Sequence, residues 1–214
     1  MSFLIDETPE EVGQRRLMVE NQLRRRGISD EKVLAAMEEI PRQIFVPPEL
    51  RPVACEDGPL PIGYDQTISQ PYIVALMSEK LAIGPDEEVL EVGTGCGYQT
   101  AILALLARRV YTIEFIPELA RHGRANLEKL GLKNIEYHIG DGRQGWPAPR
   151  QFNGILSAAA APEVPPAWRA QLADGGRLIG PVGPVEQQKL MLMRKLGVTW
   201  TEHHLCWCRF VPLK

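Results

Sequence analysis

The residues with the clearest chemical potential lie at positions 89–98, which read V-L-E-V-G-T-G-C-G-Y. Residues 89–92 are apolar apart from Glu91, as expected for a buried strand, and residues 98–107 have the composition of a helix. The glycines between them, at 93, 95 and 97, tolerate positive φ angles and let a ligand approach the backbone. Because the first N–H groups of a helix have no partner within it, this turn is predicted to bind an anionic or carboxylate-bearing ligand.

Two further carboxylates follow predicted strands. Glu114 ends the strand predicted at 110–113, about 20 positions after the glycine turn, where an acidic side chain can accept hydrogen bonds from both hydroxyls of a ribose. Asp141 lies between two glycines directly after the strand predicted at 135–139, and is placed to accept a hydrogen bond from an adenine amino group. Since open α/β sheets bind ligands at the carboxyl ends of their strands, these residues predict an adenosine-containing ligand there.

The glycine spacing separates two classes of cofactor. A dinucleotide-binding turn has the pattern G-x-G-x-x-G, whereas this chain has G-x-G-x-G, with Tyr98 where the third glycine of that pattern would stand. With Glu91 two positions before the first glycine, the pattern E-x-G-x-G-x-G resembles motif I of the S-adenosylmethionine-dependent methyltransferases. A nicotinamide-dependent dehydrogenase is therefore disfavoured, and a glycine-rich turn without a ligand stays open as the structural alternative.

The remaining pattern predicts an α/β fold that positions these residues. Two amphipathic helices, at 10–26 and 30–39, precede a proline-rich segment at 41–71 with little regular structure. Loops of this length inside a compact domain are usually functional or disordered, and the apolar residues of this one favour an ordered active-site segment. The elements predicted after it are a helix at 72–81, strands at 89–92, 110–113, 135–139, 152–157 and 177–181, a short helix at 166–172, a glycine turn at 175–176 and two antiparallel strands within 188–214.

Composition excludes several other functions. The chain has 214 residues and a net charge of −3 without a basic block, so nucleic acid is not an expected partner. No apolar run reaches the ~18 residues of a membrane helix, so no membrane partner is expected. The N-terminus becomes acidic by Asp6, which argues against a signal peptide and predicts a cytoplasmic location. The four cysteines have no metal-ligand spacing and are expected to be reduced thiols, and no metal is predicted.

With these motifs in place, nearly the whole chain resembles the protein-L-isoaspartate (D-aspartate) O-methyltransferase family. The matching pieces are M-V-E-N-Q-L (18–23), P-R-Q-I-F-V-P (41–47), L-P-I-G (60–63), Q-T-I-S-Q-P (66–71), V-L-E-V-G-T-G-C-G-Y-Q (89–99), I-E (113–114), G-D-G-R-Q-G-W-P (140–147), A-A-A-P-E-V-P (159–165), G-G-R-L-I-G-P-V-G (175–183) and F-V-P-L (210–213). Two of these, Q-T-I-S-Q-P and A-A-A-P-E-V-P, are not general methyltransferase features and narrow the resemblance to this family.

The resemblance implies both a fold and a reaction. The fold is a Rossmann-like class I S-adenosylmethionine-dependent methyltransferase with a mostly parallel seven-stranded sheet and an N-terminal helical extension. A single domain spans 1–214, with helices and an active-site loop at 1–81, a cofactor-binding core at 82–187 and antiparallel strands at 188–214. The reaction transfers a methyl group from S-adenosylmethionine to the free α-carboxylate of L-isoaspartyl residues in damaged proteins or peptides. It yields S-adenosylhomocysteine, initiates repair and implies no metal.

The same resemblance implies roles for individual residues. Ser69 is the expected catalytic residue and orients the substrate carboxylate, which is already a nucleophile at neutral pH. Glu114 is expected to hold the ribose hydroxyls, and Glu91 to fix the backbone amides of the glycine loop. The expected cofactor-binding residues are Glu91, Gly93, Thr94, Gly95, Cys96, Gly97, Glu114, Asp141 and Gly142. The expected substrate-binding residues are Thr67, Ile68, Ala159, Ala160 and Pro162.

The chain departs from the family pattern at Asp65, where glycine is usual, at Asn153, where aspartate is usual, and at Ser157, where threonine or glycine is common. These departures keep two alternatives open. One is a methyltransferase of the same fold that acts on another carboxylate, and the other is a catalytically impaired homologue that binds the cofactor. A monomer is expected, with isoaspartyl proteins or peptides as partners.

Overall fold

The computed structural model describes residues 5–214. Residues 1–4, which belong to the N-terminal segment that argues against a signal peptide, lie outside the described part. The strands of the main sheet are β3 Glu88–Val92, β4 Arg109–Glu114, β5 Ile135–Ile139, β6 Phe152–Ser157, β7 Leu172–Val182, β8 Gln188–Leu196 and β9 Thr199–Cys208. Their spatial order is β5-β4-β3-β6-β7-β8-β9. Pairing is parallel from β5 to β7 and antiparallel for β8 and β9, which confirms the expected mostly parallel seven-stranded sheet.

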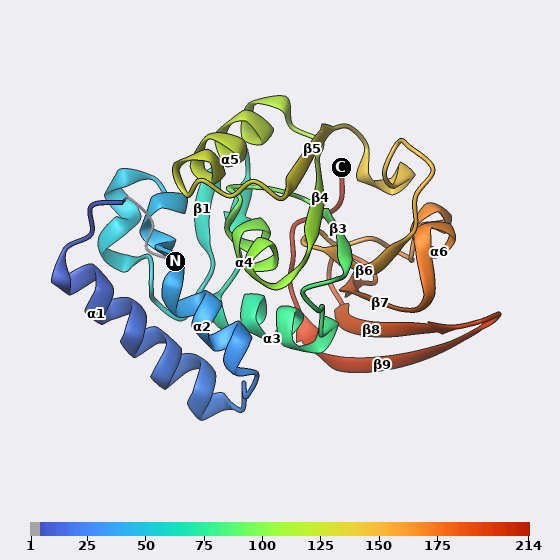
Figure 1. The fold of residues 1–214 in the computed structure, drawn as a ribbon, viewed down its shortest axis with the longest axis horizontal. Helices are drawn as coiled ribbons and strands as arrows, with labels where there is room; N and C mark the ends of the chain where they lie inside the picture. Colours follow the sequence, from blue (N-terminus) through green and yellow to red (C-terminus); the bar gives the residue numbers. More distant parts are fainter. Residues whose placement is uncertain (1–4) are drawn as a thin grey trace.

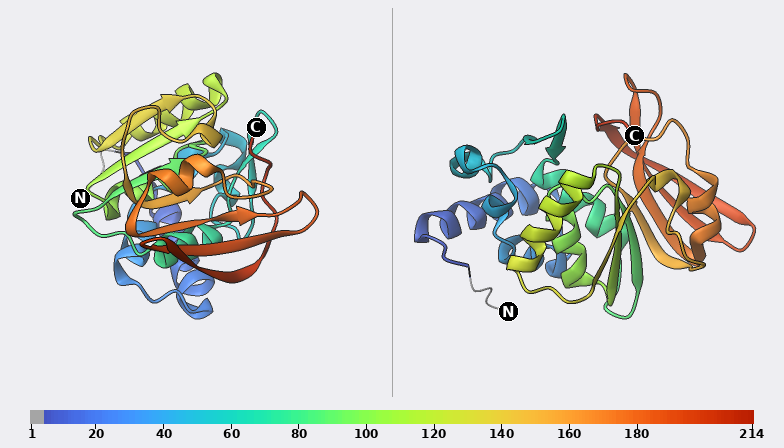
Figure 2. Two further views of the ribbon diagram at one scale, coloured as in Figure 1. Left: turned by 90° about the vertical axis from the view of Figure 1, so that its right-hand side faces the viewer. Right: turned by 90° about the horizontal axis from the view of Figure 1, so that it is seen from above.

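Helices cover both faces of this sheet (Figures 1 and 2). The α-helices of the described residues are α1 Pro9–Met18, α2 Glu31–Glu39, α3 Pro71–Leu81, α4 Tyr98–Leu106, α5 Pro117–Lys129 and α6 Pro166–Gln171. Val89 and Leu90 are neighbours on β3, and both are fully buried. Because successive strand residues point to opposite faces, Val89 packs in the core shared with helices α1–α5, and Leu90 packs in the core that contains Trp168 of α6. Burial on both faces explains the nearly continuous apolar run of this strand.

The N-terminal helices end where the sequence indicates. α1 continues through a π-helical turn, Val19–Leu23, and a 3₁₀ turn, Arg24–Arg26, to Gly27, whose φ of 92° ends the helix. Asp30 caps α2 by accepting hydrogen bonds from the first backbone amides of that helix. The blue helices of Figure 1 thus form the predicted extension beside the sheet.

The proline-rich segment at 41–71 contains more regular structure than predicted. It holds two 3₁₀ turns, Arg42–Phe45 and Pro48–Val53, and a hairpin of β1 Leu60–Gly63 and β2 Gln66–Ile68. The hairpin turn is made by Tyr64 and Asp65, with φ of 56° and 57°. Two left-handed residues in succession suit a tight hairpin, but such turns are usually marked by Gly or Asn-Gly, which explains why the pattern does not reveal this one.

The C-terminal third of the sheet also differs in detail. The predicted turn at 175–176 lies inside β7, where Gly175 has a φ of 74° and the pairing with β6 shifts register between Phe152 and Gly154. The glycines therefore bend a continuous strand instead of ending it, as glycines do at strand irregularities. The two antiparallel strands predicted within 188–214 are confirmed as β8 and β9.

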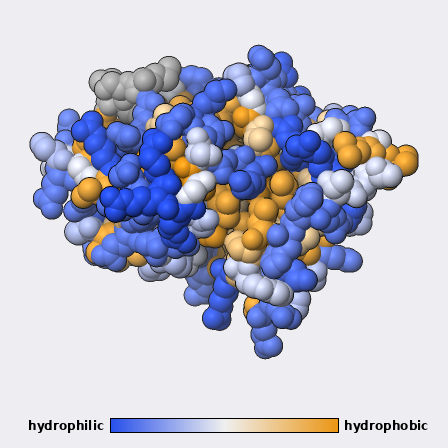
Figure 3. Space-filling model, turned by 90° about the horizontal axis from the view of Figure 1, so that it is seen from below, coloured by the Kyte–Doolittle hydropathy of each residue, from blue (hydrophilic) through white to orange (hydrophobic). Residues whose placement is uncertain are grey.

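Figure 3 shows a face that is largely hydrophilic, with apolar side chains in a hollow near its centre and at the end where the β8–β9 hairpin projects. The hairpin tip carries Leu196 and Val198, which are exposed. Within residues 5–214, none of the helices combines the length and the apolar character needed to cross a lipid bilayer.

Candidate active site

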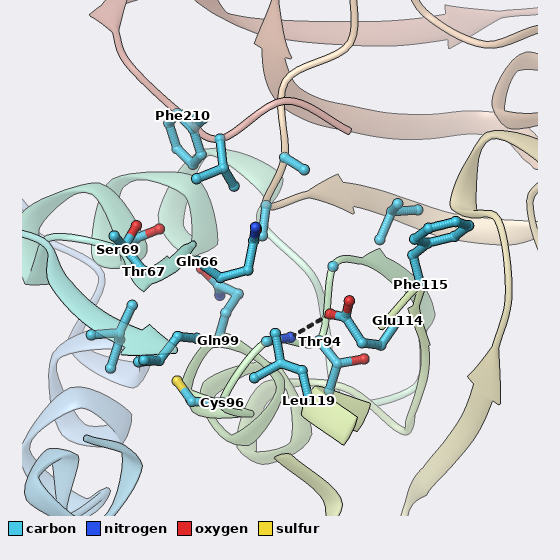
Figure 4. Close-up of a pocket in the computed structure, with 18 of the residues that line it drawn as sticks. Gln66, Thr67, Ser69, Thr94, Cys96, Gln99, Glu114, Phe115, Leu119 and Phe210 are labelled. Carbon is cyan, nitrogen blue, oxygen red and sulfur yellow. Dashed lines mark hydrogen bonds between the residues drawn. The ribbon is translucent and has the colours of Figure 1, made fainter. Parts of the chain in front are cut away.

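A pocket opens at the carboxyl ends of β3 and β4, where the sequence places the ligand (Figure 4). The empty space within it is about 850 Å³, open solvent at its mouth included. The lining residues are Ile62, Gln66, Thr67, Ile68, Ser69, Val74, Met77, Val92, Gly93, Thr94, Gly95, Cys96, Tyr98, Gln99, Ile113, Glu114, Phe115, Ile116, Leu119, Gly142, Ala158, Ala159, Phe210, Val211, Pro212, Leu213 and Lys214. The hairpin, the glycine loop, the end of β4 and the C-terminal segment thus share one pocket.

The glycine loop joins β3 to α4 along one wall of the pocket. Gly93, Gly95 and Gly97 all have positive φ, at 94°, 55° and 95°. The N–H groups of Gly93 and Thr94 donate to the carbonyl oxygen of Ile113 at 2.8 and 3.2 Å, which ties the loop to β4. The positive φ angles explain the glycine pattern, since other residues rarely adopt this conformation.

Gly97 lies outside the pocket lining, and its role is in packing. A Cβ on Gly97 would lie 2.9 Å from Cγ of Leu127 and 3.0 Å from the carbonyl oxygen of Gly123, both on α5. The third glycine of the loop therefore lets α5 approach the loop from behind.

Glu114 is the carboxylate that holds the glycine loop. Its Oε2 accepts the N–H of Gly95 at 2.9 Å, and its Oε1 accepts the N–H of Ile116 at 3.0 Å. The side chain is mostly buried and lines the pocket beside the loop (Figure 4). The end of β4 and the loop are thus fixed by one charge-assisted pair of hydrogen bonds.

Glu91 does not have the contacts expected of it, and the expectation that it fixes the loop amides is wrong. Its carboxyl group is fully buried beneath the loop, and Oε2 accepts hydrogen bonds from the hydroxyls of Thr100 at 2.5 Å and Thr112 at 2.7 Å. The Thr112 hydroxyl is also 2.7 Å from that of Thr94. Glu91 shares its strand face with Val89, so it points toward the helices and away from the pocket.

The surroundings of Glu91 change its protonation. Burial raises the pKa of Glu91 to about 8, and the hydrogen bonds from Thr100 and Thr112 only partly oppose this effect. The nearby charge of Glu114 raises this pKa further. At neutral pH the buried carboxyl group is therefore mainly protonated. It supports the loop through the hydroxyl groups of Thr100 and Thr112, and Thr112 in turn contacts Thr94 of the loop.

Ser69 and Thr67 lie across the pocket from Glu114 (Figure 4), and Ile68 between them also lines the pocket. They belong to β2 and its C-terminal continuation, so the hairpin places the predicted catalytic hydroxyl across the pocket from the loop. Nη2 of Arg42 donates to the carbonyl oxygen of Ser69 at 2.7 Å and anchors this segment from behind.

The G-D-G motif also lies at this edge of the sheet, but only one of its residues lines the pocket. Gly142 lines the pocket, and a Cβ there would lie 2.3 Å from Cγ1 of Val92. Asp141 lies outside the lining residues and caps the following 3₁₀ turn by accepting the N–H of Arg143 at 2.9 Å. The Arg143 guanidinium, 2.8 Å from the carboxylate, holds the pKa of Asp141 below its usual range.

The A-A-A-P run reaches the pocket through Ala159. Ala160 is a neighbour of the C-terminal segment, since its N–H donates to the carbonyl of Val211 and its carbonyl accepts the N–H of Leu213, each at 2.8 Å. Pro162 is exposed and lies outside the lining residues.

None of the three residues that depart from the family pattern lines the pocket. Asp65 is exposed at the hairpin tip and does not line the pocket. Asn153 Oδ1 accepts the N–H of Glu88 at 2.9 Å at the amino ends of β6 and β3, at the opposite edge of the sheet from the pocket. Ser157 is fully buried and donates to the carbonyl of Ala159 at 2.7 Å.

Several lining residues are absent from the predicted set. Gln66 and Gln99 point polar side chains at the pocket, and Phe210 closes its upper side in Figure 4. The segment around Phe210 is held by Gln188, whose Oε1 accepts the N–H of Phe210 at 2.6 Å. The F-V-P-L match marks this segment, but no spacing rule connects it to a loop more than 100 residues earlier.

The cysteines are all free thiols, as predicted. Cys96 lines the pocket within the glycine loop, and burial raises its pKa to about 11, so it is a neutral thiol at physiological pH. Across residues 5–214, no group of three or more His, Cys, Asp or Glu side chains is arranged to hold a metal ion.

Comparison with known proteins agrees with this geometry. The family described as Protein-L-isoaspartate(D-aspartate) O-methyltransferase (PCMT) matches residues 14–214. The chain is 50% identical over 200 residues to a protein-L-isoaspartate O-methyltransferase of Methanoregula boonei, covering 94% of this chain and 92% of the relative. It is 49% identical over 203 residues to one of Picosynechococcus, covering 95% and 91%.

Solved structures show the same likeness. A protein-L-isoaspartate O-methyltransferase structure superposes with a TM-score of 0.82 at 28% identity, covering 92% of this chain and 65% of that one. A Plasmodium falciparum structure, assigned to the same activity and complexed with S-adenosyl-L-homocysteine, gives a TM-score of 0.82 at 25% identity, covering 94% and 98%. The class I methyltransferase fold is thereby confirmed.

Proposed function

The chain belongs to the protein-L-isoaspartate (D-aspartate) O-methyltransferase family, and we propose that it methylates the free α-carboxylate of L-isoaspartyl residues. An oxygen of that carboxylate forms a bond to the methyl carbon of S-adenosylmethionine while the carbon–sulfur bond breaks. The products are a neutral methyl ester and S-adenosylhomocysteine. The sulfonium supplies an electrophilic methyl group, so no strong general base is required.

The observation that carries this proposal is the placement of two different walls in one pocket. Glu114 and the glycine loop form a wall that suits an adenosine ligand, and Ser69 with Thr67 forms the wall opposite. Methyl transfer from one bound molecule to another requires such facing sites, because most of the acceleration comes from holding the reacting atoms in line.

The chain's residues have the following proposed roles. The Ser69 hydroxyl donates a hydrogen bond to one carboxylate oxygen of the substrate and orients the other toward the methyl group, and Thr67 assists. Ile68 and Ala159 supply the apolar surface that excludes water, with Ala160 and Pro162 shaping the outer mouth.

On the cofactor side of the pocket, some residues are proposed to contact the cofactor and others to support the glycine loop from beneath. Gly93, Thr94, Gly95 and Cys96 surround the methionine and ribose portions, and Gly142, with Asp141 behind it, faces the adenine. Glu114 accepts from the ribose hydroxyls with the lone pairs that its two backbone contacts leave available. Glu91 and Gly97 act from beneath the loop, because neither lines the pocket.

Beyond the family's activity, we propose a cytoplasmic monomer that acts on isoaspartyl proteins and peptides and not on nucleic acid or membranes. A single domain with the three segments given above suits this proposal. The net charge of −3 supports it, since nucleic-acid binding favours a basic surface.

The test is methyl transfer from labelled S-adenosylmethionine to an isoaspartyl peptide, with the matching aspartyl peptide as control. We expect label in the first peptide only, in a base-labile ester. Label in both peptides would favour a methyltransferase for other carboxylates. Cofactor binding without label in either would favour the impaired homologue.

A further inference from the structure

Arg42 is a buried cation for which the proposed mechanism gives no use. It lies at the start of the 3₁₀ turn Arg42–Phe45, and none of its surface is exposed. Nε donates to the carbonyl oxygen of Ala54 at 2.7 Å, and Nη2 donates to that of Ser69 at 2.7 Å. Arg42 therefore contacts the backbone of the residue proposed to orient the substrate carboxylate.

The same guanidinium also contacts the cofactor side of the pocket. Its central carbon lies 4.6 Å from the ring centroid of Tyr98, the first residue of α4 and a lining residue of the pocket. Arg42 thus lies behind the junction of the two walls, touching the substrate wall at Ser69 and the end of the glycine loop at Tyr98.

Among the residues that the structure describes, no carboxylate forms an ion pair with Arg42. The titratable groups that face Arg42 are Tyr98, Cys96 and Cys55. Burial raises the pKa of Cys96 to about 11 and that of Tyr98 to about 12, and it raises the pKa of Cys55 as well. All three are neutral at physiological pH, whereas an arginine keeps its proton.

Anchoring the Ser69 segment by hydrogen bonds does not by itself require a charged side chain at position 42. Neutral amide groups can also donate to two carbonyl oxygens, and burying an unpaired cation opposes folding. Charges act more strongly in such a low-dielectric site than in water. An anion that enters the pocket beside Ser69 would therefore be favoured by the charge behind that residue.

We propose, on the basis of the function proposed above, that Arg42 is a positioning and specificity residue for the substrate carboxylate. Its two hydrogen bonds fix the Ser69 segment, and its charge favours the ionised acid over neutral groups of the same shape. Methylation converts the acid to a neutral ester, so the same charge favours release of the product.

This role predicts an effect on affinity more than on rate. The positive charge stabilises the carboxylate before transfer, and the negative charge declines as the ester forms. Loss of the charge should therefore raise KM for the peptide and leave kcat less affected.

The experiment compares four proteins loaded with S-adenosylhomocysteine: wild type, Arg42→Lys, Arg42→Gln and the exposed control Arg25→Met. Fluorescence anisotropy measures the affinity of a labelled isoaspartyl peptide and of its α-carboxamide and α-methyl ester analogues. Circular dichroism and S-adenosylhomocysteine titration verify folding and the cofactor site of each variant.

We expect wild type and Arg25→Met to prefer the acid over the carboxamide by roughly tenfold or more, the range that a nearby opposite charge produces. Arg42→Lys keeps most of this preference because it keeps the charge. Arg42→Gln loses it, although it retains hydrogen-bond donors, and its KM rises while cofactor affinity is unchanged.

Two results would overturn the proposal. One is an Arg42→Gln variant that keeps the preference for the acid. The other is an equal loss of that preference in the Lys and Gln variants, which would indicate that Arg42 only anchors the Ser69 segment through hydrogen bonds. If Arg42→Gln does not fold, loss of the preference in a folded Arg42→Lys variant would also count against it. A wild-type protein that binds S-adenosylhomocysteine but no isoaspartyl peptide would instead refute the proposed function itself.

Discussion

Gly123 on α5 lies so close to Gly95 in the glycine loop that a Cβ on Gly123 would be 2.5 Å from the Gly95 carbonyl oxygen. The side chain of Asn126, one turn further along α5, donates to the carbonyl of Cys96 at 3.2 Å. The helix that follows β4 therefore supports the loop from behind, through a contact that only glycine permits.

Gly123→Ala should weaken binding of S-adenosylhomocysteine, because the added methyl group must displace the backbone at Gly95. Alanine is otherwise favoured over glycine in a helix by about 1 kcal/mol. A decrease in the stability of the Gly123→Ala variant would therefore come from the clash between the added methyl group and the backbone of Gly95. Gly13→Ala in α1 is the matched control, since a Cβ there meets no atom within 4 Å. Isothermal titration and thermal unfolding should separate the two variants, and identical behaviour would contradict the packing argument.

Glu114→Gln should lower cofactor affinity. The amide can accept from only one of the two backbone N–H groups that the carboxylate now holds, and it replaces an acceptor for the ribose by a donor. We expect a loss of about 1.5–3 kcal/mol in the binding of S-adenosylhomocysteine, the range for hydrogen bonds to a charged group. Glu118→Gln, an exposed change on α5, should bind like wild type. Unchanged affinity in the Glu114 variant would remove this residue from the cofactor site.

Ser69→Ala should slow methyl transfer while leaving the cofactor site intact. Losing one hydrogen bond to the carboxylate predicts a decrease in kcat/KM of roughly tenfold to a hundredfold. Single-turnover transfer to an isoaspartyl peptide measures the effect, and titration with S-adenosylhomocysteine should show wild-type affinity. Transfer at the wild-type rate would mean that the hydroxyl does not orient the substrate.

Glu91→Gln should change how stability depends on pH. The pKa of Glu91 is about 8 in the folded protein and near its ordinary value of 4.5 in the unfolded chain. The folded state therefore holds an extra proton between these values, and its stability falls as pH rises from about 4.5 to 8. A neutral glutamine removes this dependence and can still accept from Thr100 and Thr112.

The variant should resemble wild type near pH 4.5 and be more stable at pH 8 by about 4 kcal/mol. Urea unfolding at pH 5, 6.5 and 8 measures the difference. Parallel pH profiles for the two proteins would show that Glu91 is ionised in the fold.

The elements with strong local patterns were predictable from sequence. The strand before Gly93, the helix after Gly97 and the start of the second helix near Asp30 all occur where composition and spacing place them. The hairpin at Tyr64 and Asp65 was not, because two non-glycine residues adopt left-handed conformations there.

The site was predictable as a set of residues but not as a set of contacts. The sequence marks Glu91 and Glu114 as two carboxylates near one loop, but only the fold shows that Glu114 holds the loop amide and that Glu91 is buried below. The contact between Arg42 and Ser69 spans 27 positions, beyond the reach of any periodicity.

The pocket draws its walls from segments near residues 62–69, 93–99, 113–116 and 210–214. During synthesis on the ribosome, the wall that contains Phe210 emerges after the other three, and it is positioned through Gln188 and Ala160. A nascent chain that already contains the glycine loop therefore still lacks one side of the pocket. Ligand binding that uses all of these walls can stabilise the protein only after the segment around Phe210 has been made, so the earlier folding steps proceed without that support.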